Sequence, residues 1–462
     1  MYREKLSVNT STAFTRHLGM FVNPRGSHLT ERTKPLSEWI EQRTDLNVWP
    51  YARSIEQAPR TTTRIKSQND RTVAGINFGS QDYLGLSSHP AITDAAISAL
   101  REYGPHSAAS PMLQGNTSLS RRLESEISDF LRLEHVLLFP TGWSAGFGTI
   151  VGLVRPNDYI VIDQLAHSCL MQGARAATEN TFFFKHNDIT SLRKRLERIR
   201  AKDRDNAILV VSEGLFSMDS DSPDISGIQE TCRDFGAVFM LDVAHDFGAS
   251  GPQGTGQLGV QEMLGKVDLV MGSFSKTFSS NGGFLATHDR AVKQFIGIYG
   301  GSHAFSNAIS PIQAGVVLEA MRIVRSEEGD QLRDIARSNI DYLRALFRSR
   351  GIECLGQPSN IVPVTVGDET VAKLISSLLE QKGLLANLVE FPAVSRGKAR
   401  FRFQVMATHT EEQIEQAVEI FCESFVEAKQ MIGSVPCLED DFIEMPLPAE
   451  MTEPVSAQLE TV

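Results

Sequence analysis

The sequence contains few cysteines, no long apolar run and no excess of basic side chains. Its 462 residues include five cysteines, which are widely separated and form no Cys-x-x-Cys pair, so neither a disulfide framework nor a metal site is expected. No run of 18 or more apolar residues occurs, and the N-terminus lacks the apolar core of a secretory signal. These absences favour a cytoplasmic protein without an integral membrane segment.

Charge excludes another class of function. The chain has 45 Lys and Arg against 56 Asp and Glu, a formal net charge of −11. Because no domain carries the basic excess that neutralises a phosphate backbone, we expect no nucleic-acid role. The last acidic residues lie in a stretch without Lys or Arg, and residues 432–462 are therefore predicted to be a disordered acidic tail.

Short β-rich runs alternate with helical patterns from residue 135 onward. This alternation predicts an α/β fold with a mostly parallel, seven-stranded sheet covered by helices on both faces. One helix should start after Asp188, and a capping box at residues 410–413 should open the last one. The seven expected strands are 135–139, 159–162, 181–184, 208–211, 238–241, 269–271 and 284–286.

The distribution of helical and strand-like patterns along the chain also predicts its domains. We expect a leader and helical arm at residues 1–75 and a large cofactor-binding domain at 76–310. After residue 311, long helical patterns with few strands predict a smaller C-terminal α+β domain at 311–431, followed by the tail. With 41% hydrophobic residues, the chain is able to bury a large core in these domains.

Two motifs carry the chemistry. Lys276 follows an apolar strand-like run, and about thirty positions upstream Asp242 and His245 follow another. A lysine forms a Schiff base with an aldehyde cofactor, and a carboxylate keeps a pyridine nitrogen protonated so that the ring draws electrons from a substrate's α-carbon. A strand-end carboxylate alone is commonly a helix N-cap. Together, the motifs predict a pyridoxal 5′-phosphate (PLP) site.

Other candidates end neighbouring strands, where ligands of open α/β sheets bind. Thr141, Gly142 and Trp143 should open a helix whose N–H groups hold the cofactor phosphate, although this turn alone also fits an ordinary strand-to-helix connection. Ser273 offers a hydroxyl to the same phosphate. His167 is a candidate for stacking on the pyridine ring, or else a surface histidine. Ser217 is a candidate for a hydrogen bond to the phenolic oxygen, or else a turn serine.

Several motifs together resemble the α-oxoamine synthase family, in the family's order from about residue 75 to 428. The resemblance implies the PLP-dependent transferase fold type I and a homodimer with active sites at the subunit interface. The motifs that carry it are residues 77–86, 115–118, 216–219, 242–245, 272–276 and 399–402.

The resemblance also implies roles for individual residues. Lys276 would bind the cofactor aldehyde covalently, His167 would stack on the ring, and Arg402 would bind the amino acid's carboxylate, with Arg400 as the alternative. The remaining roles are Asp242 at the ring nitrogen, His245 and Ser217 near the phenolic oxygen, Thr141, Gly142, Trp143 and Ser273 at the phosphate, Ser306 and Asn307 at the phosphate of the other subunit, and Gln81 and Tyr83 at the substrate.

The chain departs from the family pattern at several positions. Residues 106–112 replace a Gly-rich segment, Ser120 replaces a histidine, and Glu390 lies where some relatives have arginine. Gln81 stands in place of an asparagine, and Asn307 in place of a hydroxyl residue. Because these changes fall where substrates are expected, they leave the choice of substrates open.

The resemblance implies a decarboxylative condensation of a small amino acid (serine, alanine or glycine) with an acyl thioester, giving an α-amino ketone. The donor is either acyl-CoA or an acyl carrier protein, and a basic helix at residues 193–204 is a candidate docking surface or a solvated face. Transamination or aldol cleavage on the same fold, and a regulatory non-catalytic subunit, are the alternatives.

Overall fold

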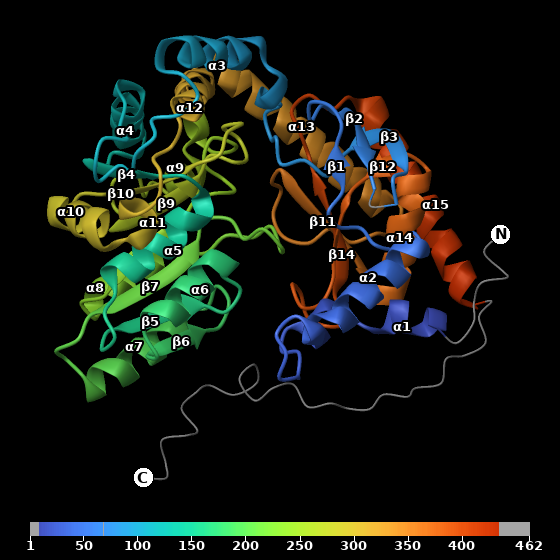
Figure 1. Cartoon of the computed structure of the whole chain (residues 1–462), viewed down its shortest axis with the longest axis horizontal. Helices are drawn as coiled ribbons and strands as arrows, with labels where there is room; N and C mark the ends of the chain where they lie inside the picture. Colours follow the sequence, from blue (N-terminus) through green and yellow to red (C-terminus); the bar gives the residue numbers. More distant parts are fainter. Residues whose placement is uncertain (1–8, 68, 434–462) are drawn as a thin grey trace. The chain divides into compact units, whose positions relative to one another are not determined.

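The computed structural model describes residues 9–67 and 69–433, which fall into two compact units (Figure 1). The first unit comprises residues 9–93, 217–221 and 325–433, and the second comprises residues 94–216 and 222–324. Each unit has its own sheets and core, and each is described by itself below.

The second unit is built on a seven-stranded sheet with the order β4-β10-β9-β8-β7-β5-β6. All its strands run parallel except β10, which is antiparallel to both β4 and β9. The expected fold and all seven expected strands are confirmed, with ends that differ by at most two residues. The strands are β4 (His135–Phe139), β5 (Tyr159–Asp163), β6 (Thr181–Phe184), β7 (Ile208–Glu213), β8 (Val238–Asp242), β9 (Leu269–Ser273) and β10 (Gly283–Thr287).

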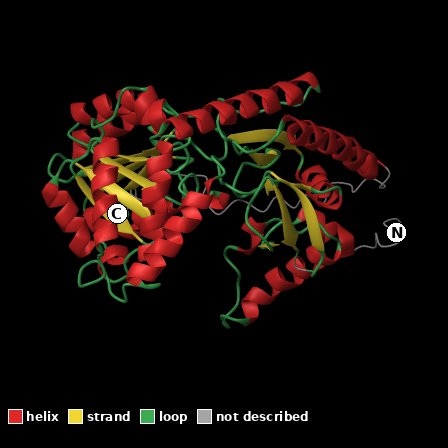
Figure 2. Ribbon diagram, turned by 90° about the horizontal axis from the view of Figure 1, so that it is seen from above, coloured by secondary structure: helices red, strands yellow, loops and turns green. Residues whose placement is uncertain are grey.

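Helices cover both faces of this sheet, as Figure 2 shows in red around the yellow strands. Apolar side chains of β5, β7 and β9, such as Ile162, Val211 and Met271, pack with Ile150 and Leu170 from two of these helices. Truncating one such side chain to Ala costs roughly 2–5 kcal/mol. The helices are α4 (Ser118–Leu131), α5 (Gly142–Leu153), α6 (Ser168–Ala177), α7 (Ile189–Lys202), α8 (Ile225–Asp234), α9 (Gly256–Val260), α10 (Arg290–Tyr299), α11 (Gly301–Ala304) and α12 (Pro311–Val324).

The first unit contains two smaller sheets, of order β11-β14-β13 and β1-β2-β3-β12. Helix α15 opens with the expected capping box, because the Gln413 N–H donates to Thr410 Oγ1 at 3.3 Å and the Thr410 N–H donates to Gln413 Oε1 at 3.2 Å. The strands are β1 (Ser54–Ile55), β2 (Thr62–Lys66), β3 (Thr72–Asn77), β11 (Ile361–Gly367), β12 (Leu384–Leu385), β13 (Asn387–Val389) and β14 (Ala399–Gln404), and the helices are α1 (Asn9–Thr15), α2 (Lys34–Asp45), α13 (Glu327–Ser349), α14 (Glu369–Gln381) and α15 (Glu411–Gly433), while α3 (Pro90–Tyr103) spans the boundary between the units.

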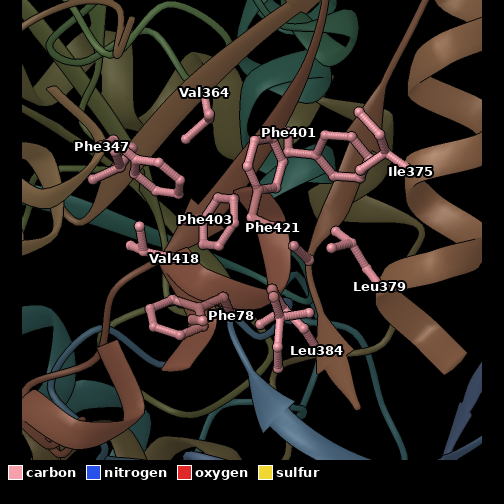
Figure 3. Packing of buried hydrophobic residues seen from close by; sticks show 14 of the residues in the cluster. Phe78, Phe347, Val364, Ile375, Leu379, Leu384, Phe401, Phe403, Val418 and Phe421 are labelled. Carbon is pink, nitrogen blue, oxygen red and sulfur yellow. The ribbon is translucent and has the colours of Figure 1, made fainter. Parts of the chain in front are cut away.

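Aromatic rings form the centre of this unit's core (Figure 3). Phe403 of β14 meets Phe347 of α13 edge-on with ring centroids 5.2 Å apart, and Phe421 of α15 meets Phe401 at 5.6 Å. Each such pair adds about 0.5–1.5 kcal/mol beyond the burial of its area. The core therefore ties strands and helices of the C-terminal region into one body.

The units do not follow the domain limits expected from the sequence. Strand β3 pairs in parallel with β12, which joins the N-terminal region to the C-terminal one. Helix α12 belongs to the second unit, although the smaller domain was expected to begin at residue 311. Residues 217–221 belong to the first unit, although the residues directly before and after them, 94–216 and 222–324, belong to the second unit. The predicted tail at residues 434–462 lies outside the described residues.

A buried ion-pair network attaches the N-terminal region to the rest of the first unit. Arg43 Nη1 lies 3.1 Å from Glu390 Oε1, and the Lys373 amine lies 3.5 Å from Glu390 Oε2 and donates to the Phe14 carbonyl at 2.6 Å. Burial lowers the pKa of Lys373, and the charge of Glu390 opposes this shift. Breaking a buried pair of this kind typically costs 3–5 kcal/mol. Glu390 therefore has a structural partner of its own, which accounts for one departure from the family pattern.

Candidate active site

Four strands of the second unit end in polar residues at one edge of the sheet. Asp163, Glu213, Asp242 and Ser273 are the last residues of β5, β7, β8 and β9, and in the pairing register Glu213 lies opposite Asp242. Ligands of open α/β sheets bind beyond these carboxyl ends. The structure thus brings Asp242 and Ser273, two of the expected site residues, to a single edge together with Asp163 and Glu213.

Lys276 lies three residues beyond β9, in a turn closed by a 3.0 Å hydrogen bond from the Phe274 N–H to the Gly282 carbonyl. Its charge acts on Asp242: burial raises the pKa of Asp242, whereas Lys276 first and His167 second lower that pKa. The structure therefore places Lys276, from one motif, and His167, a separate candidate, within electrostatic reach of Asp242 from the other motif.

Glu213 is a member of this group that the sequence analysis missed. It is buried, and its Oε1 accepts a 2.5 Å hydrogen bond from the His167 N–H. Burial and then the neighbouring Asp242 raise the pKa of Glu213 well above its usual value. Its position as the last residue of an apolar strand, one strand away from Asp242, was the available signal. Glu213 positions the backbone of His167.

His167 is oriented through one ring nitrogen. It precedes α6, and its Nδ1 lies 3.3 Å from the Cys169 N–H and 3.0 Å from Cys169 Sγ. The Cys169 thiol is buried, which raises its pKa, so it stays a neutral donor to the ring at neutral pH. The His167 residue is exposed, and its ring is thus held in place while remaining accessible to a flat ligand.

The phosphate candidates meet at the start of α5. Thr141 caps this helix, since its Oγ1 accepts from the Ser144 N–H at 3.0 Å, and no bond from the N–H groups of Gly142 and Trp143 is found among the described residues. A Cβ at Gly142 would lie 2.4 Å from Ser273 Oγ, so only glycine lets the helix start approach this hydroxyl. Free N–H donors, a helix N-terminus and a serine hydroxyl fit a phosphate group.

His245 and Asp246 follow Asp242 and are both buried. The assignment of His245 to the phenolic oxygen stays a prediction. Asp246 Oδ2 accepts a 2.6 Å bond from the Gln257 N–H, while its buried Oδ1 has no hydrogen-bond partner in the described part of the chain. Burial raises the pKa of Asp246 to about 7, although the Gln257 amide opposes this shift.

Asp246→Asn is expected to become relatively more stable as pH rises. In the wild type the unfolded chain ionises Asp246 near pH 4 and the folded chain only near pH 7, so wild-type stability falls across this window. A shift of this size corresponds to roughly 4 kcal/mol in total. Melting temperatures of the cofactor-free proteins from pH 4 to 8 should diverge in favour of the variant. A constant difference across that range would contradict the assignment.

The substrate candidates lie in the first unit. Arg400 already has partners within this unit, since its guanidinium pairs with Asp219 at 2.5 Å and donates to the Met218 carbonyl at 3.1 Å. Arg402 donates from Nη1 to the Ser217 carbonyl at 3.2 Å, but its buried Nε has no partner among the described residues. Burial lowers the pKa of Arg402, and the nearby Tyr83 hydroxyl opposes this shift. Arg402 is therefore the better candidate for an external carboxylate.

The other candidates of this unit have less defined roles. Tyr83 is fully buried, so it is placed to support Arg402 rather than to face solvent. Gln81 is partly exposed on the loop after β3, and Ser217 is buried. Because the two units are described separately, the roles of Ser217, Gln81, Tyr83, Arg400 and Arg402 at the edge of the large sheet stay predictions.

Two departures from the family pattern have local explanations in the second unit. Ser120 completes a capping box at the start of α4, where its Oγ accepts from the Thr117 N–H at 2.9 Å. The segment 106–112 is tied to the chain near residue 307, because the Ala308 N–H donates to the Ala109 carbonyl at 3.1 Å. Ser306 and Asn307 lie in that second loop, and their assignment to the other subunit's phosphate stays a prediction.

Comparison with known proteins identifies the family. Residues 73–421 match the family Aminotransferase class I and II. The serine palmitoyltransferase of Bacteriovorax stolpii is 30% identical over 82% of this chain and 88% of its own length. The 8-amino-7-oxononanoate synthase of Trichlorobacter lovleyi is 33% identical over 83% of this chain and 95% of its own. The chain belongs to the α-oxoamine synthase family of PLP-dependent acyltransferases.

Solved structures of this family share the fold. A serine palmitoyltransferase variant from S. paucimobilis with bound PLP and myriocin superimposes with a TM-score of 0.81 at 25% identity, covering 87% of this chain and 100% of that one. The Sphingomonas wittichii serine palmitoyltransferase superimposes with a TM-score of 0.79 at 27% identity, covering 89% and 100%. Within residues 9–67 and 69–433, no helix has the length and apolarity needed to cross a membrane.

Proposed function

We propose that this α-oxoamine synthase condenses a small amino acid, namely serine, alanine or glycine, with an acyl thioester. A bond forms between the amino acid's α-carbon and the acyl carbon, the thiol leaves, and the bond to the carboxylate breaks with release of carbon dioxide. The product is an α-amino ketone. The observation that carries the proposal is the electrostatic grouping of Lys276, His167 and Asp242 at one edge of the sheet.

When bound, PLP supplies an electron-withdrawing pyridinium conjugated to the substrate's α-carbon. The chain's own residues do the rest. Lys276 Nζ would hold the cofactor aldehyde until the amino acid's amine displaces it, and the freed Nζ would then take the proton from the α-carbon. Asp242 would keep the proton on the ring nitrogen, and the charges of Lys276 and His167 favour the ionised form of Asp242. His167, whose backbone N–H donates to Glu213, would pack against the ring.

Arg402 is proposed to bind the amino acid's carboxylate. Its unpaired Nε and planar guanidinium suit a bidentate pair with a carboxylate. The guanidinium of Arg400 is already paired with Asp219. Of the two arginines, Arg402 is therefore the one with free donor capacity.

Arg402→Ala should therefore raise the KM for the amino acid. Loss of a buried charge-assisted pair costs about 2–5 kcal/mol, which corresponds to a 30-fold or larger increase in KM. The KM for the acyl donor should change little. Arg400→Ala is the matched control: it should lower the melting temperature by freeing Asp219, with a smaller effect on the amino acid's KM. The reverse ranking of the two variants would assign the carboxylate to Arg400.

Apolar residues exposed on the second unit support the proposed homodimer. Phe305 is 91% exposed and Leu113 is 82% exposed. These side chains belong to the two loops joined by the bond between Ala308 and Ala109. Large exposed apolar side chains gathered on adjoining loops are typical of an interface.

The four described cysteines are free thiols, which supports the proposed cytoplasmic location.

The reaction is tested by thiol release from a palmitoyl thioester in the presence of PLP and each amino acid in turn. We expect release that depends on both the amino acid and the thioester, with one carbon dioxide formed per thiol. Amino-group transfer to a keto acid without thiol release would instead establish a transaminase. Cleavage of a β-hydroxy amino acid without a thioester would establish an aldolase.

A further inference from the structure

Helix α7 presents a basic face to solvent. Leu192, Leu196 and Ile199 form its buried stripe. On the opposite side, Lys194, Arg198 and Lys202 follow one another at intervals of four residues and are exposed. Residues at this spacing lie on the same helix face, and the row spans about 12 Å at a rise of 1.5 Å per residue. Arg195 adds a fourth cation beside Arg198.

Two other basic residues of α7 are used within the fold. Arg193 pairs with Asp234 of α8 at 2.7 Å. Arg200 donates to the Phe235 and Asn206 carbonyls, each at 2.8 Å. By contrast, no ion pair is found for Lys194, Arg195, Arg198 or Lys202 with any carboxylate of the described residues. Arg195 nevertheless lies over the Phe182 ring, with its guanidinium carbon 5.4 Å from the ring centroid. Lys194, Arg198 and Lys202 are therefore distinct from the residues that hold α7 in place.

The uncompensated row opposes folding. Burial lowers the pKa of Arg195, and the neighbouring charge of Arg198 lowers it further. Like charges four residues apart on a helix destabilise it by about 0.2–0.5 kcal/mol per pair. The body of the protein carries no general basic excess, so this concentration of charge is local. It creates a positive potential that attracts an acidic partner.

The start of α7 is attached to the edge of the sheet that holds the candidate site. Asp163, the last residue of β5, accepts from the Asn187 N–H at 3.0 Å and lies 3.0 Å from His186 Nδ1. His167 follows the same strand four residues later. Along the helix axis, Lys194 and Lys202 lie about 8 and 20 Å from Ile189. A partner on this face would stand beside the site rather than over it.

We propose that the basic row of α7, comprising Lys194, Arg195, Arg198 and Lys202, docks an acidic acyl carrier protein that delivers the acyl thioester. The inference rests on the proposed condensation and specifies its donor. An extended row of cations matches a carrier helix bearing several carboxylates. The phosphates of a single nucleotide would require convergent donors instead. The carrier's flexible prosthetic arm would reach the site past the end of β5.

The test compares two donors with the same acyl chain. Thiol release from palmitoyl carrier protein and from palmitoyl-CoA is measured with the PLP-loaded enzyme and its best amino acid. Lys194→Glu with Arg198→Glu should lower kcat/KM for the carrier thioester at least tenfold and flatten its dependence on salt. The value for palmitoyl-CoA should stay within twofold. Arg71→Glu with Arg348→Glu, an equal charge change at exposed positions in the first unit, should alter neither value.

Each other outcome overturns the docking proposal. Equal losses with both donors would indicate damage to the fold, and a loss with palmitoyl-CoA alone would indicate a nucleotide site on α7. A wild-type enzyme that uses palmitoyl-CoA but not the carrier thioester would remove the docking role and leave the condensation standing. A wild-type enzyme that releases thiol from neither donor would refute the condensation, and the docking role with it.

Discussion

Lys276→Ala is expected to abolish both covalent attachment of PLP and turnover. Lys276 lies three residues beyond the carboxyl end of β9, and its charge lowers the pKa of the buried Asp242. Removing the residue that we propose as both the covalent anchor and the base should lower kcat by about 10⁴-fold, the upper end of the range for loss of a general base. Borohydride reduction followed by peptide mapping should find a pyridoxyl group on Lys276 of the wild type and none on the variant.

Lys266→Ala provides the matched control. Lys266 is an exposed lysine of the same unit, so its loss should change neither attachment nor rate. A pyridoxyl group on any other lysine of the wild type, or turnover by Lys276→Ala near the wild-type rate, would refute the assignment of the active-site lysine.

Asp242→Asn should bind PLP and yet lose about 10²–10³-fold in kcat, the range for removal of one preorganised electrostatic group. The asparagine oxygen still accepts from the Ala244 N–H, which Asp242 does at 2.9 Å, so the local turn should persist. Without the carboxylate, the ring nitrogen loses its proton and the ring withdraws fewer electrons. Steady-state rates and the visible spectrum of the bound cofactor measure the two effects separately.

Asp242→Glu keeps the charge and should recover part of the rate, although the longer side chain fits the buried position less well. An asparagine variant within tenfold of the wild type, with cofactor bound, would show that the ring nitrogen does not depend on this carboxylate. A variant that fails to bind PLP would be assessed by its melting temperature, which should stay close to that of the wild type because burial already disfavours the charge of Asp242.

The sequence predicted the large sheet and its central chemistry because both are local. Each strand is a short apolar run. Asp242 ends one of them, and Lys276 and His167 follow two others within four residues. Glu213 escaped notice because none of the motifs that carry the family resemblance includes it. Only the pairing of β7 with β8 shows that it is buried beside Asp242.

Long-range pairing explains the remaining differences. Strand β12 has two residues, too few for any periodicity, yet it joins the N-terminal strands to the C-terminal region. Arg43 and Glu390 are 347 residues apart, and each alone reads as a surface charge. The ion pair between Arg400 and Asp219 likewise joins residues 181 positions apart. No local pattern predicts such partners.

The attachment of the N-terminal region limits how far this protein can be shortened. The family match begins at residue 73, which suggests that everything before it is dispensable. Cutting there would remove Arg43, which lies against Trp39 and Trp49, and would leave Glu390 in an apolar interior with Lys373 as its remaining basic neighbour. It would also strip β2 from β3 and expose a strand edge prone to self-association. Recombinant production should therefore retain the residues from α1 onward.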